Sequence, residues 1–477
     1  MSSPRKPKAK QVAPQSPTPK QSVLPPDVAR HQKTAFNWLL LWLIAVYVVL
    51  TSLLIFAVPI GQTPDEGAHL DYIEYIATKA RMPIFNAASA PGYGYEFHQP
   101  PLYYLVCAPV WKVAVAAGGK EAGAYACRLI SLTCGVFTLV LLWHAIGHFF
   151  QASAERRTLQ VLAVGLGALW PLHQGVGASA GNDALAGLMS AALFFLVVAR
   201  SAKEEVRTTL SRRAALLGIC LGLAILAKTT NFILCVVAFG AVISWWIHVD
   251  REKRGPIILP LATLVLTAAI VCGWWLLRNQ LLYGDPLAAQ VFQRAFSQSS
   301  HGPSWFFERG TSLMVYLELV AGFLFCSAFG VMGGSNTAQR HLASAMVVGV
   351  EPGKEFIWVA IAFLGLCALA CVVSLSGWRS RKLMASLSVS VSAQQGVLLW
   401  LLGLALVTLA WGLFNLSYFQ VQARYFHPAL LPMCLFFAIG WRQALVSERV
   451  LRATSFGFGG VLLLITLWNV FVWKTLV

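Results

Sequence analysis

The sequence predicts an all-α polytopic membrane protein, and two observations support this class. Hydrophobic residues make up 57% of the chain and charged residues only 12%, whereas soluble domains carry about 25% charged residues. The apolar residues also gather in stretches of about 20 residues, the length that a helix needs to cross the hydrocarbon core of a bilayer. We therefore expect a bundle of about 11 to 13 transmembrane helices with short juxtamembrane helices outside the membrane.

The net charge of +17 has a different origin from that of a nucleic-acid-binding protein. Lys and Arg lie in short runs between apolar stretches, where they set the orientation of the chain and contact anionic lipids. We therefore expect membrane lipids, and no nucleic acid, among the partners. The ten cysteines lie mostly within apolar stretches and form no CxxC pair, so we interpret them as small hydrophobic residues.

The first part of the chain differs in composition from the rest. Residues 1–36 contain seven Lys or Arg, seven Pro and one acidic residue, and such a stretch cannot bury an apolar core. We expect it to be a disordered basic tail in the cytoplasm, followed by a transmembrane domain over 37–477. The candidate spans are 37–58, 126–149, 159–178, 183–200, 212–229, 231–249, 255–277, 354–376, 395–416, 424–441 and 454–473, with further apolar stretches at 102–117 and 313–332.

The basic loops determine the expected orientation, because Lys and Arg concentrate in short cytoplasmic loops. If the tail and all basic loops face the cytoplasm, segments 59–125 and 278–353 lie wholly outside. The stretches 102–117 and 313–332 would then not cross the membrane. The alternative is that both cross and that one or two basic loops break the rule. We expect a bacterial inner membrane, a cytoplasmic N-terminus and a site on the extracytoplasmic side.

Ionisable and polar side chains gather at the external ends of the predicted spans. Charged groups cost about 2.5–3.5 kcal/mol at the centre of a span and by default mark a functional site. The alternative is that single basic residues at span ends anchor the helices at the interface. The candidate site residues are Asp65, Glu66, His69, His98, Arg128, Asp183, Lys228, Arg278, Arg424 and Tyr425.

The acidic pair follows a signal for a helix start. We expect Thr63 to be the N-cap and Pro64 the first helical residue, with Asp65 and Glu66 in the first turn, where the helix dipole favours carboxylates. Helix capping is therefore one interpretation of these acids. The other is chemical, because a carboxylate at the membrane surface is suited to deprotonating an acceptor hydroxyl.

Two arginines are the best candidates for holding a phosphate leaving group. Arg278 follows the segment 273–277, and Arg424 lies with Tyr425 in the segment 422–428; a guanidinium binds phosphate oxygens in bidentate fashion. A donor that already carries a phosphate leaving group needs no metal ion.

A metal site has less support from the sequence. His69 and His98 follow neither an HxxxH nor an HExxH spacing, which argues against a tightly bound zinc. An assisting divalent cation, Mg²⁺ or Mn²⁺, stays open. The chain contains no P-loop, so nucleotide hydrolysis lacks support.

Four elements of the sequence together resemble the GT-C superfamily of glycosyltransferases, which use polyprenyl-phosphate-linked sugars. They are Asp65-Glu66, His98-Gln99-Pro100-Pro101-Leu102-Tyr103-Tyr104, Arg128, and Asn182-Asp183 in the second external loop. Protein O-mannosyltransferases and the aminoarabinose transferases of lipid A are familiar members. The resemblance runs through the membrane region and implies a GT-C-like bundle.

The resemblance also implies a reaction and its site residues. A sugar would pass, with inversion, from a polyprenyl-phosphate donor to a hydroxyl of a glycan, lipid or protein acceptor in the cell envelope. Asp65, or alternatively Glu66, would act as general base or position the acceptor, and Asp183 would match the family's second acid. The groups on the lipid phosphate would be Arg278, Arg424 or Lys228.

Two rival functions come from other classes. The same acids and arginines suit a transporter or flippase of lipid-linked sugars, but a transporter should have inverted repeats and ionisable residues near span centres. We find no convincing repeat, and the charges gather at one face. A scaffold of polysaccharide assembly without catalytic activity is the third interpretation, and the intact acidic pair argues against it.

Overall fold

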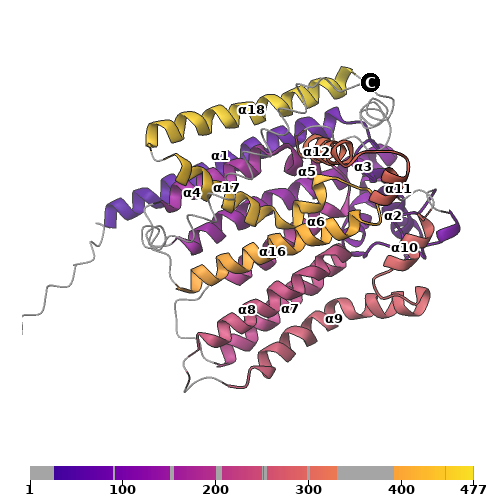
Figure 1. The fold of residues 1–477 in the computed structure, drawn as a ribbon, viewed down its shortest axis with the longest axis horizontal. Coiled ribbons are helices and arrows are strands. Elements are labelled where there is room, and N and C mark those ends of the chain that lie inside the picture. The colour runs from indigo at the N-terminus through magenta and orange to yellow at the C-terminus, as the bar shows by residue number, and fades with distance from the viewer. Residues whose placement is uncertain are drawn as a thin grey trace, which may run out of the picture.

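The protein is a bundle of helices whose long members lie roughly side by side (Figure 1). The computed structural model describes residues 26–89, 92–150, 155–199, 207–249, 251, 255–297, 301–329, 391–445 and 447–475. Within these ranges the regular secondary structure is helical and no strand occurs. This confirms the predicted all-α membrane class.

The elements follow one another through the whole described chain. They are α1 (Pro26–Ala57), α2 (Glu66–Lys79), η1 (Ala87–Ser89), α3 (Leu102–Phe149), α4 (Arg156–Leu169), α5 (Pro171–Gly177), α6 (Asn182–Val198), α7 (Arg207–Ala227), η2 (Thr229–Leu234), α8 (Cys235–Ile247), α9 (Ile258–Tyr283), α10 (Ala289–Ala295), α11 (Pro303–Glu308), α12 (Leu313–Phe329), α16 (Val391–Asn415), η4 (Ala423–Ala429), α17 (Leu430–Ala444) and α18 (Glu448–Thr475).

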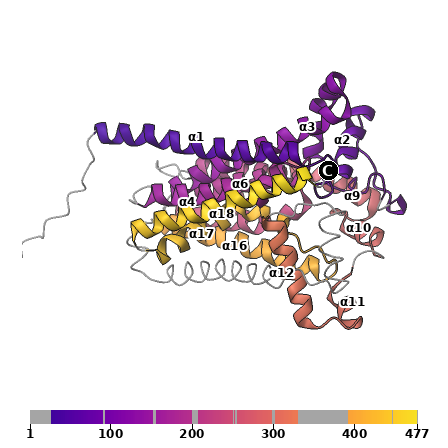
Figure 2. The ribbon, with the colours of Figure 1, turned by 90° about the horizontal axis from the view of Figure 1, so that it is seen from above.

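The long helices run from α18 along one edge of the bundle to α9 along the opposite edge (Figure 1). The short elements α2, α10 and α11 gather at one end of the bundle (Figures 1 and 2). Figure 2 also shows that α2 and part of α3 project beyond the long helices at this end. The loops that carry the candidate site therefore meet at a single end of the bundle.

The main core lies between α3, α6, α8 and α16. Trp143, Phe194 and Trp400 are fully buried there, and the Trp400 indole N–H donates a hydrogen bond to the Phe194 carbonyl at 3.0 Å. An indole donor that finds a carbonyl keeps a large apolar side chain from leaving a polar atom unpaired in the membrane interior.

Glycines allow α7 and α9 to approach closely. A Cβ on Gly218 would lie 2.3 Å from the Leu264 carbonyl oxygen, and one on Gly222 would lie 2.7 Å from Val271. The spacing of these two glycines is the small-xxx-small pattern that lets helix backbones come together in membranes.

Seven helices in the described part of the chain are long and apolar enough to cross a membrane, or eight if α5 and α6 are counted as one bent span. The prediction of one continuous span over 159–178 is wrong. Helix α4 ends at Leu169 and Trp170 is extended, because Pro171 disfavours the helical conformation of the residue before it. The bend between α5 and α6 is 115°, which returns the chain at the end where the site lies.

One other predicted span is also not a continuous α-helix. The segment 424–441 begins as the 3₁₀ turn η4, which contains Pro428, and becomes α-helical only from Leu430. Within the further apolar stretch 313–332, residues 313–329 form helix α12, whose Phe325 packs against α18. The predicted span 354–376 lies outside the described residues.

Helix α3 consists of two helices joined at a break. Gly118 and Gly119 are not helical, and Gly119 has a φ of 78°. Trp111 before the break packs against Gly123 after it, so the two halves turn back on each other. The break thus separates the stretch 102–117 from the predicted span 126–149; that 102–117 does not cross the membrane stays a prediction.

The first helix begins earlier than expected. Helix α1 begins at Pro26, inside the stretch 1–36 that we predicted to be disordered. Proline is favoured at the first helical position because its missing N–H has no partner there in any case. The first 25 residues lie outside the described part.

Candidate active site

A cavity of about 810 Å³ opens at the end of the bundle where the short elements gather. Its polar wall comes from the loop before α2, the segment 95–99, the residue that follows α7, and η4. Its apolar wall comes from α10 and the last turns of α16. Of the ten predicted site residues, the cavity is lined by Asp65, Glu66, His69, His98, Lys228, Arg424 and Tyr425.

Asp65 has an unusual backbone conformation at the start of α2. It precedes the helix with φ 60° and ψ 5°, the left-handed region, and its side chain does not cap the helix. Asp tolerates this region better than most residues, and such strained positions cluster at functional sites. The prediction that Thr63 is the N-cap is wrong, because its hydroxyl forms a hydrogen bond with the Ser179 hydroxyl at 2.6 Å.

The Asp65 carboxylate is held by two partners. One oxygen, Oδ1, accepts a hydrogen bond from the Tyr95 hydroxyl at 2.5 Å, and the other, Oδ2, forms an ion pair with Arg424. Burial opposes ionisation of Asp65, but Arg424 and His69 outweigh it and hold the pKa of this carboxyl well below its ordinary value. The side chain is nevertheless 26% exposed, so a substrate can reach it.

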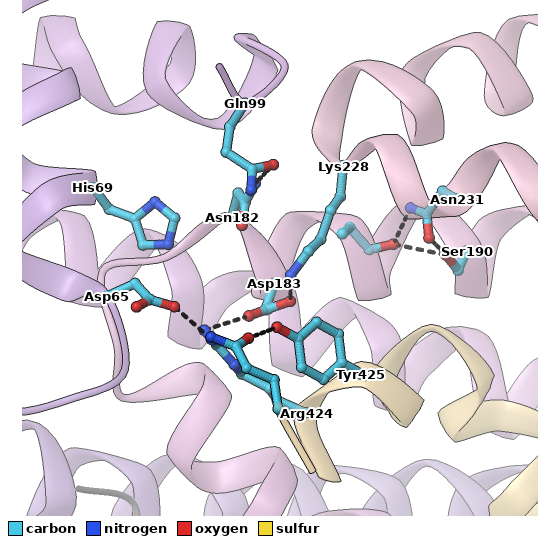
Figure 3. Close-up of polar contacts among 12 residues, drawn as sticks. Asp65, His69, Gln99, Asn182, Asp183, Ser190, Lys228, Asn231, Arg424 and Tyr425 are labelled. Atoms are coloured by element: carbon cyan, nitrogen blue, oxygen red, sulfur yellow. Dashed lines mark hydrogen bonds and ion pairs between the residues drawn. The ribbon is translucent and has the colours of Figure 1, made fainter. Parts of the chain in front are cut away.

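Arg424 connects Asp65 to a second acid and a second base (Figure 3). Its Nη1 lies 3.5 Å from Oδ2 of Asp183, and Asp183 also forms an ion pair with Lys228. The order is therefore Asp65, Arg424, Asp183, Lys228, with alternating charges that come from four separate parts of the chain. We call these four residues the charge chain.

The close packing of η4 on α6 brings the charge chain together. A Cβ on Gly187 would lie 2.2 Å from the His427 ring, so only glycine lets η4 lie this close to α6. His427 is buried, and its Nε2 lies 2.9 Å from Nδ1 of His173. Because burial lowers the pKa of His427 to about 4, this imidazole adds no third cation beside Asp183, which already pairs with Arg424 and Lys228.

Glu66 contributes to the cavity wall, but its carboxylate is enclosed. Its oxygens accept two hydrogen bonds from Arg128 at 2.7 Å each and one each from the backbone N–H groups of Gly61 and Ala180. Both side chains are fully buried. Burial opposes ionisation of Glu66, but Arg128 and the two N–H groups outweigh it and lower its pKa.

Arg128 serves the backbone as well as Glu66. Its guanidinium also donates to the carbonyl groups of Ile55, Val58 and Pro59, where the backbone leaves α1. The pair therefore ties the end of α1, the start of α2 and the turn before α6 to α3. Neither the guanidinium nor the carboxylate has a free face for a substrate.

Two predicted histidines lie in the cavity wall. Nδ1 of His69 lies 2.9 Å from the Tyr104 hydroxyl, and Nδ1 of His98 lies 2.8 Å from the Tyr95 carbonyl oxygen. Burial lowers the pKa of His69 and lowers that of His98 to about 4. His98 therefore acts as a hydrogen-bond donor to its own loop.

The structure does not bring Arg278 into the cavity. Its Nη2 donates to the Pro83 carbonyl at 2.5 Å, and its guanidinium carbon lies 4.8 Å from the centre of the Trp275 ring. Tyr425, by contrast, lies beside the charge chain (Figure 3), with its ring 5.4 Å from Nζ of Lys228.

Sequence reasoning missed Glu96 and Tyr95 as members of the site. Glu96 lines the cavity, is 5% exposed, and its Oε2 has no hydrogen-bond partner among the described residues. The signal was present, because both residues precede His98 in a segment rich in aromatic side chains. The sequence alone could not place Tyr95 on Asp65.

The turn between α5 and α6 contains a pattern that could suggest another chemistry. Residues 177–181 read GxSxG, the pattern of a nucleophile elbow, which requires a strand-to-helix turn. Here the turn joins two helices, and the Ser179 hydroxyl is paired with Thr63. The pattern therefore lacks the context of a hydrolase.

The described residues contain no group of three or more His, Cys, Asp or Glu side chains placed to hold a metal ion. The acids of the charge chain are instead neutralised by Arg424 and Lys228.

Comparison with known proteins identifies the fold. Residues 74–284 match the model of a family described as "Predicted membrane protein (DUF2142)". No curated protein matches the sequence significantly. Among solved structures, the oligosaccharyltransferase of Archaeoglobus fulgidus in the apo form aligns with a TM-score of 0.51 and 13% identity, over 91% of this chain and 55% of that chain.

Two further structures are similar over most of the chain. AglB from Archaeoglobus fulgidus, in complex with an inhibitory peptide and a dolichol-phosphate, has a TM-score of 0.49 and 14% identity over 91% of this chain and 55% of that chain. ArnT from Cupriavidus metallidurans, bound to undecaprenyl phosphate, has a TM-score of 0.40 and 14% identity over 86% of this chain and 78% of that chain.

The fold and site thus define a class of membrane protein. The likeness to the apo oligosaccharyltransferase confirms the predicted GT-C-like fold. The chain spans 55% of the length of that enzyme, and at 13% identity the likeness establishes the fold alone.

Proposed function

We propose that the protein is an integral-membrane glycosyltransferase that moves a sugar from a polyprenyl-phosphate-linked donor to an acceptor hydroxyl on the extracytoplasmic side. The charge chain at the cavity is the observation that carries this proposal. It holds two cations beside two acids at the end of a membrane bundle. The GT-C-like fold supports the same class.

Arg424 and Lys228 are the proposed contacts of the donor phosphate. Both line the cavity and both are paired with carboxylates, which an incoming phosphate can replace as the anionic partner. A guanidinium and an ammonium together neutralise a phosphodiester and orient it. We propose no phosphate contact for Arg278, because it lies outside this cavity.

Asp65 is the proposed general base. When a phosphate takes over Arg424, Asp65 loses the cation that stabilises its charge and becomes a stronger base. The acceptor oxygen then forms a bond to the anomeric carbon while the bond from that carbon to the phosphate oxygen breaks. The acceptor proton passes to Asp65 and polyprenyl phosphate leaves, with inversion at the anomeric carbon.

The apolar wall of the cavity suits the hydrocarbon of the donor. Phe292 on α10 and Phe296 just after it line the site, together with Val407 and Phe414 on α16. A polyprenyl chain can therefore approach between α10 and α16 while its phosphate reaches the charge chain. The solved structures of AglB with dolichol-phosphate and of ArnT with undecaprenyl phosphate are precedents for lipids of this class on such membrane proteins.

The positions of the charges favour an enzyme over a transporter of lipid-linked sugars. The charge chain lies where α2 and α6 begin and where α7 ends, whereas a transporter places ionisable residues near the middle of its spans. The acceptor is a glycan, a lipid or a protein of the cell envelope.

The test uses protein reconstituted in vesicles. The donors are labelled undecaprenyl-phosphate sugars, offered as a panel of glucose, galactose, mannose and arabinose, and the acceptor is a cell-envelope extract. The wild type and Glu121→Gln, which changes an exposed acid on α3, should transfer label to the extract, and Asp65→Asn should not. Undiminished transfer by Asp65→Asn would remove Asp65 from the mechanism. Movement of lipid-linked label across the vesicle membrane without any transfer product would favour the transporter.

A further inference from the structure

Two cysteines face each other across the break in α3. Cys107 lies in the half of α3 before Gly118 and Gly119, and Cys127 lies in the half after them. Both side chains are fully buried, and the Cys107 thiol forms a hydrogen bond with that of Cys127. The proposed sugar transfer uses neither thiol, so this contact between two reactive groups calls for a chemistry of its own.

The contacts on either side of the two cysteines fix how the halves of α3 pack. On one side, the Tyr103 hydroxyl lies 2.9 Å from the Ser131 hydroxyl. On the other side, a Cβ on Gly123 would lie 2.8 Å from the Trp111 ring. Each cysteine is four residues from both contacts along its own half of α3, and residues four apart share a helix face. The antiparallel packing of the two halves therefore places the thiols opposite each other.

The first half of α3 lies at the end of the bundle that holds the cavity. The hydroxyl of Tyr104, in this half, is 2.9 Å from Nδ1 of His69, and α2 and part of α3 project together beyond the long helices (Figure 2). The basic loops predict that this end faces the extracytoplasmic side. Thiols are oxidised to disulfides in such compartments, whereas cytosolic thiols stay reduced.

We propose that Cys107 and Cys127 are joined by a disulfide bond in the membrane-inserted protein. The two thiols lose two protons and two electrons as the S–S bond of about 2.05 Å forms. A protein disulfide of the cell envelope accepts them by thiol–disulfide exchange and is reduced to two thiols. Because α2 packs on this part of α3 and buries both cysteines, the bond forms before α2 covers them. The proposal does not depend on the reaction of the cavity.

The disulfide would stabilise the support of α2. It closes a loop of about 20 residues that contains the break at Gly118 and Gly119, where no helical hydrogen bonding holds the two halves together. The Tyr104 ring, three residues before Cys107, stacks on the Tyr72 ring of α2 with the ring centres 3.8 Å apart. A covalent bond between the two halves therefore fixes the surface on which α2 rests.

The experiment determines the redox state of individual thiols in the full chain after insertion into a bacterial inner membrane. Membranes are denatured in N-ethylmaleimide, then reduced and labelled with a second maleimide of different mass, and the peptides are analysed by mass spectrometry. In the wild type, Cys107 and Cys127 should carry only the second label. Cys220 and Cys434, which are buried in the main core, should carry the first.

Single variants identify the partner of each thiol. In Cys107→Ala, Cys127 should carry the first label, because its partner is gone. In the control Cys134→Ala, which changes another buried cysteine of α3, Cys107 and Cys127 should still carry only the second label. First label on both thiols of the wild type, or no change at Cys127 in Cys107→Ala, would contradict the proposal.

Unfolding curves measure the effect of the bond on stability. A reductant should lower the thermal unfolding midpoint of the wild type by several degrees and leave that of Cys107→Ala unchanged. An equal response of the two proteins would show that this disulfide does not stabilise the hairpin. Neither measurement involves a sugar or a lipid phosphate, so failure of this proposal leaves the proposed function untouched, and the reverse also holds.

Discussion

Asp65 and Glu66 are neighbours in the chain, yet they occupy opposite kinds of environment. The Asp65 side chain is 26% exposed and ion-pairs with an arginine that faces a cavity. The Glu66 side chain is fully buried, and its oxygens are occupied by Arg128 and two backbone N–H groups. Asp65 is therefore placed where a substrate can replace it at Arg424, whereas Glu66 stays bound to Arg128.

The backbone causes this difference. The left-handed conformation of Asp65 turns its side chain away from α2, toward η4 and Tyr95. Glu66 is the first helical residue and reaches back toward α3. The comparison teaches that an acidic pair in a first external loop can divide the work, with one carboxylate available for chemistry and the other fixing the loop.

The largest expected effect comes from Asp65→Asn. Loss of the proposed base should lower the rate of sugar transfer by about 10²–10⁴-fold, because an amide cannot take the acceptor proton. The thermal unfolding midpoint should fall less than it does for a change at Glu66, since the Asp65 side chain is partly exposed and Arg424 keeps Asp183 as a partner. Transfer assays and unfolding curves on the same preparation check both parts, and a large fall in the midpoint would make Asp65 a structural residue like Glu66.

Breaking the buried pair should act on stability instead. Arg128→Met leaves Glu66 as a buried charge without a cation and should lower the free energy of unfolding by about 3–5 kcal/mol. The double variant Glu66→Gln with Arg128→Met should recover part of this loss, because no unpaired charge remains. If Arg128→Met unfolded like the wild type but failed to transfer sugar, the buried pair would serve the reaction instead of stability, and its contrast with Asp65 would be wrong.

Arg424 and Arg278 should differ in their effect on the lipid. Arg424→Lys keeps the charge but loses the bidentate geometry, so the dissociation constant for undecaprenyl phosphate should rise by about 10- to 100-fold, the equivalent of about 1.4–2.7 kcal/mol. Arg278→Lys should leave it unchanged, because this side chain binds the Pro83 carbonyl. Equal weakening by both substitutions would place the phosphate elsewhere.

The pH dependence of stability should reflect two carboxyls with depressed pKa values. The pKa of Asp65 and that of Glu66 are both lowered in the folded protein, so the unfolded chain binds more protons in mild acid. Their contribution to stability is complete above the ordinary carboxyl pKa, about 4, and is lost as the pH falls through the lower folded values. Between about pH 5 and pH 7 these two carboxyls should therefore not change the thermal unfolding midpoint. In Glu66→Gln the fall of the midpoint in acid should be smaller than in the wild type.

Removal of divalent cations should have the smallest effect. The acids of the charge chain are neutralised by Arg424 and Lys228, and a phosphate leaving group needs no further activation. Transfer rates measured with and without a chelator should therefore agree. A loss of transfer that Mg²⁺ or Mn²⁺ restores would show that a cation takes part in the site.

Much of the fold and part of the site follow from the sequence. Long apolar stretches and sparse charge are sufficient for an all-α membrane bundle, and the basic loops place Asp65, Asp183, Lys228 and Arg424 at one end. The break at Pro171 and the turn at Pro428 were harder to predict from the sequence, because apolar residues continue on both sides of each proline. Hydropathy reports burial, whereas the direction of the backbone depends on local steric effects.

The details of the site depend on contacts between distant segments. Nothing near Arg278 in the sequence indicates that it binds the carbonyl of Pro83, and the adjacent acids Asp65 and Glu66 look equivalent until their backbone conformations are known. Glu96 was overlooked because its significance lies in a missing partner. Such an absence is a property of the folded cavity.

The central claim is that the charge chain receives a lipid phosphate and thereby frees Asp65. The most direct measurement is a structure of the protein with undecaprenyl phosphate bound. The account predicts the phosphate between Arg424 and Lys228, with the ion pair between Asp65 and Arg424 open. A phosphate at Arg278, with the pair between Asp65 and Arg424 intact, would contradict it.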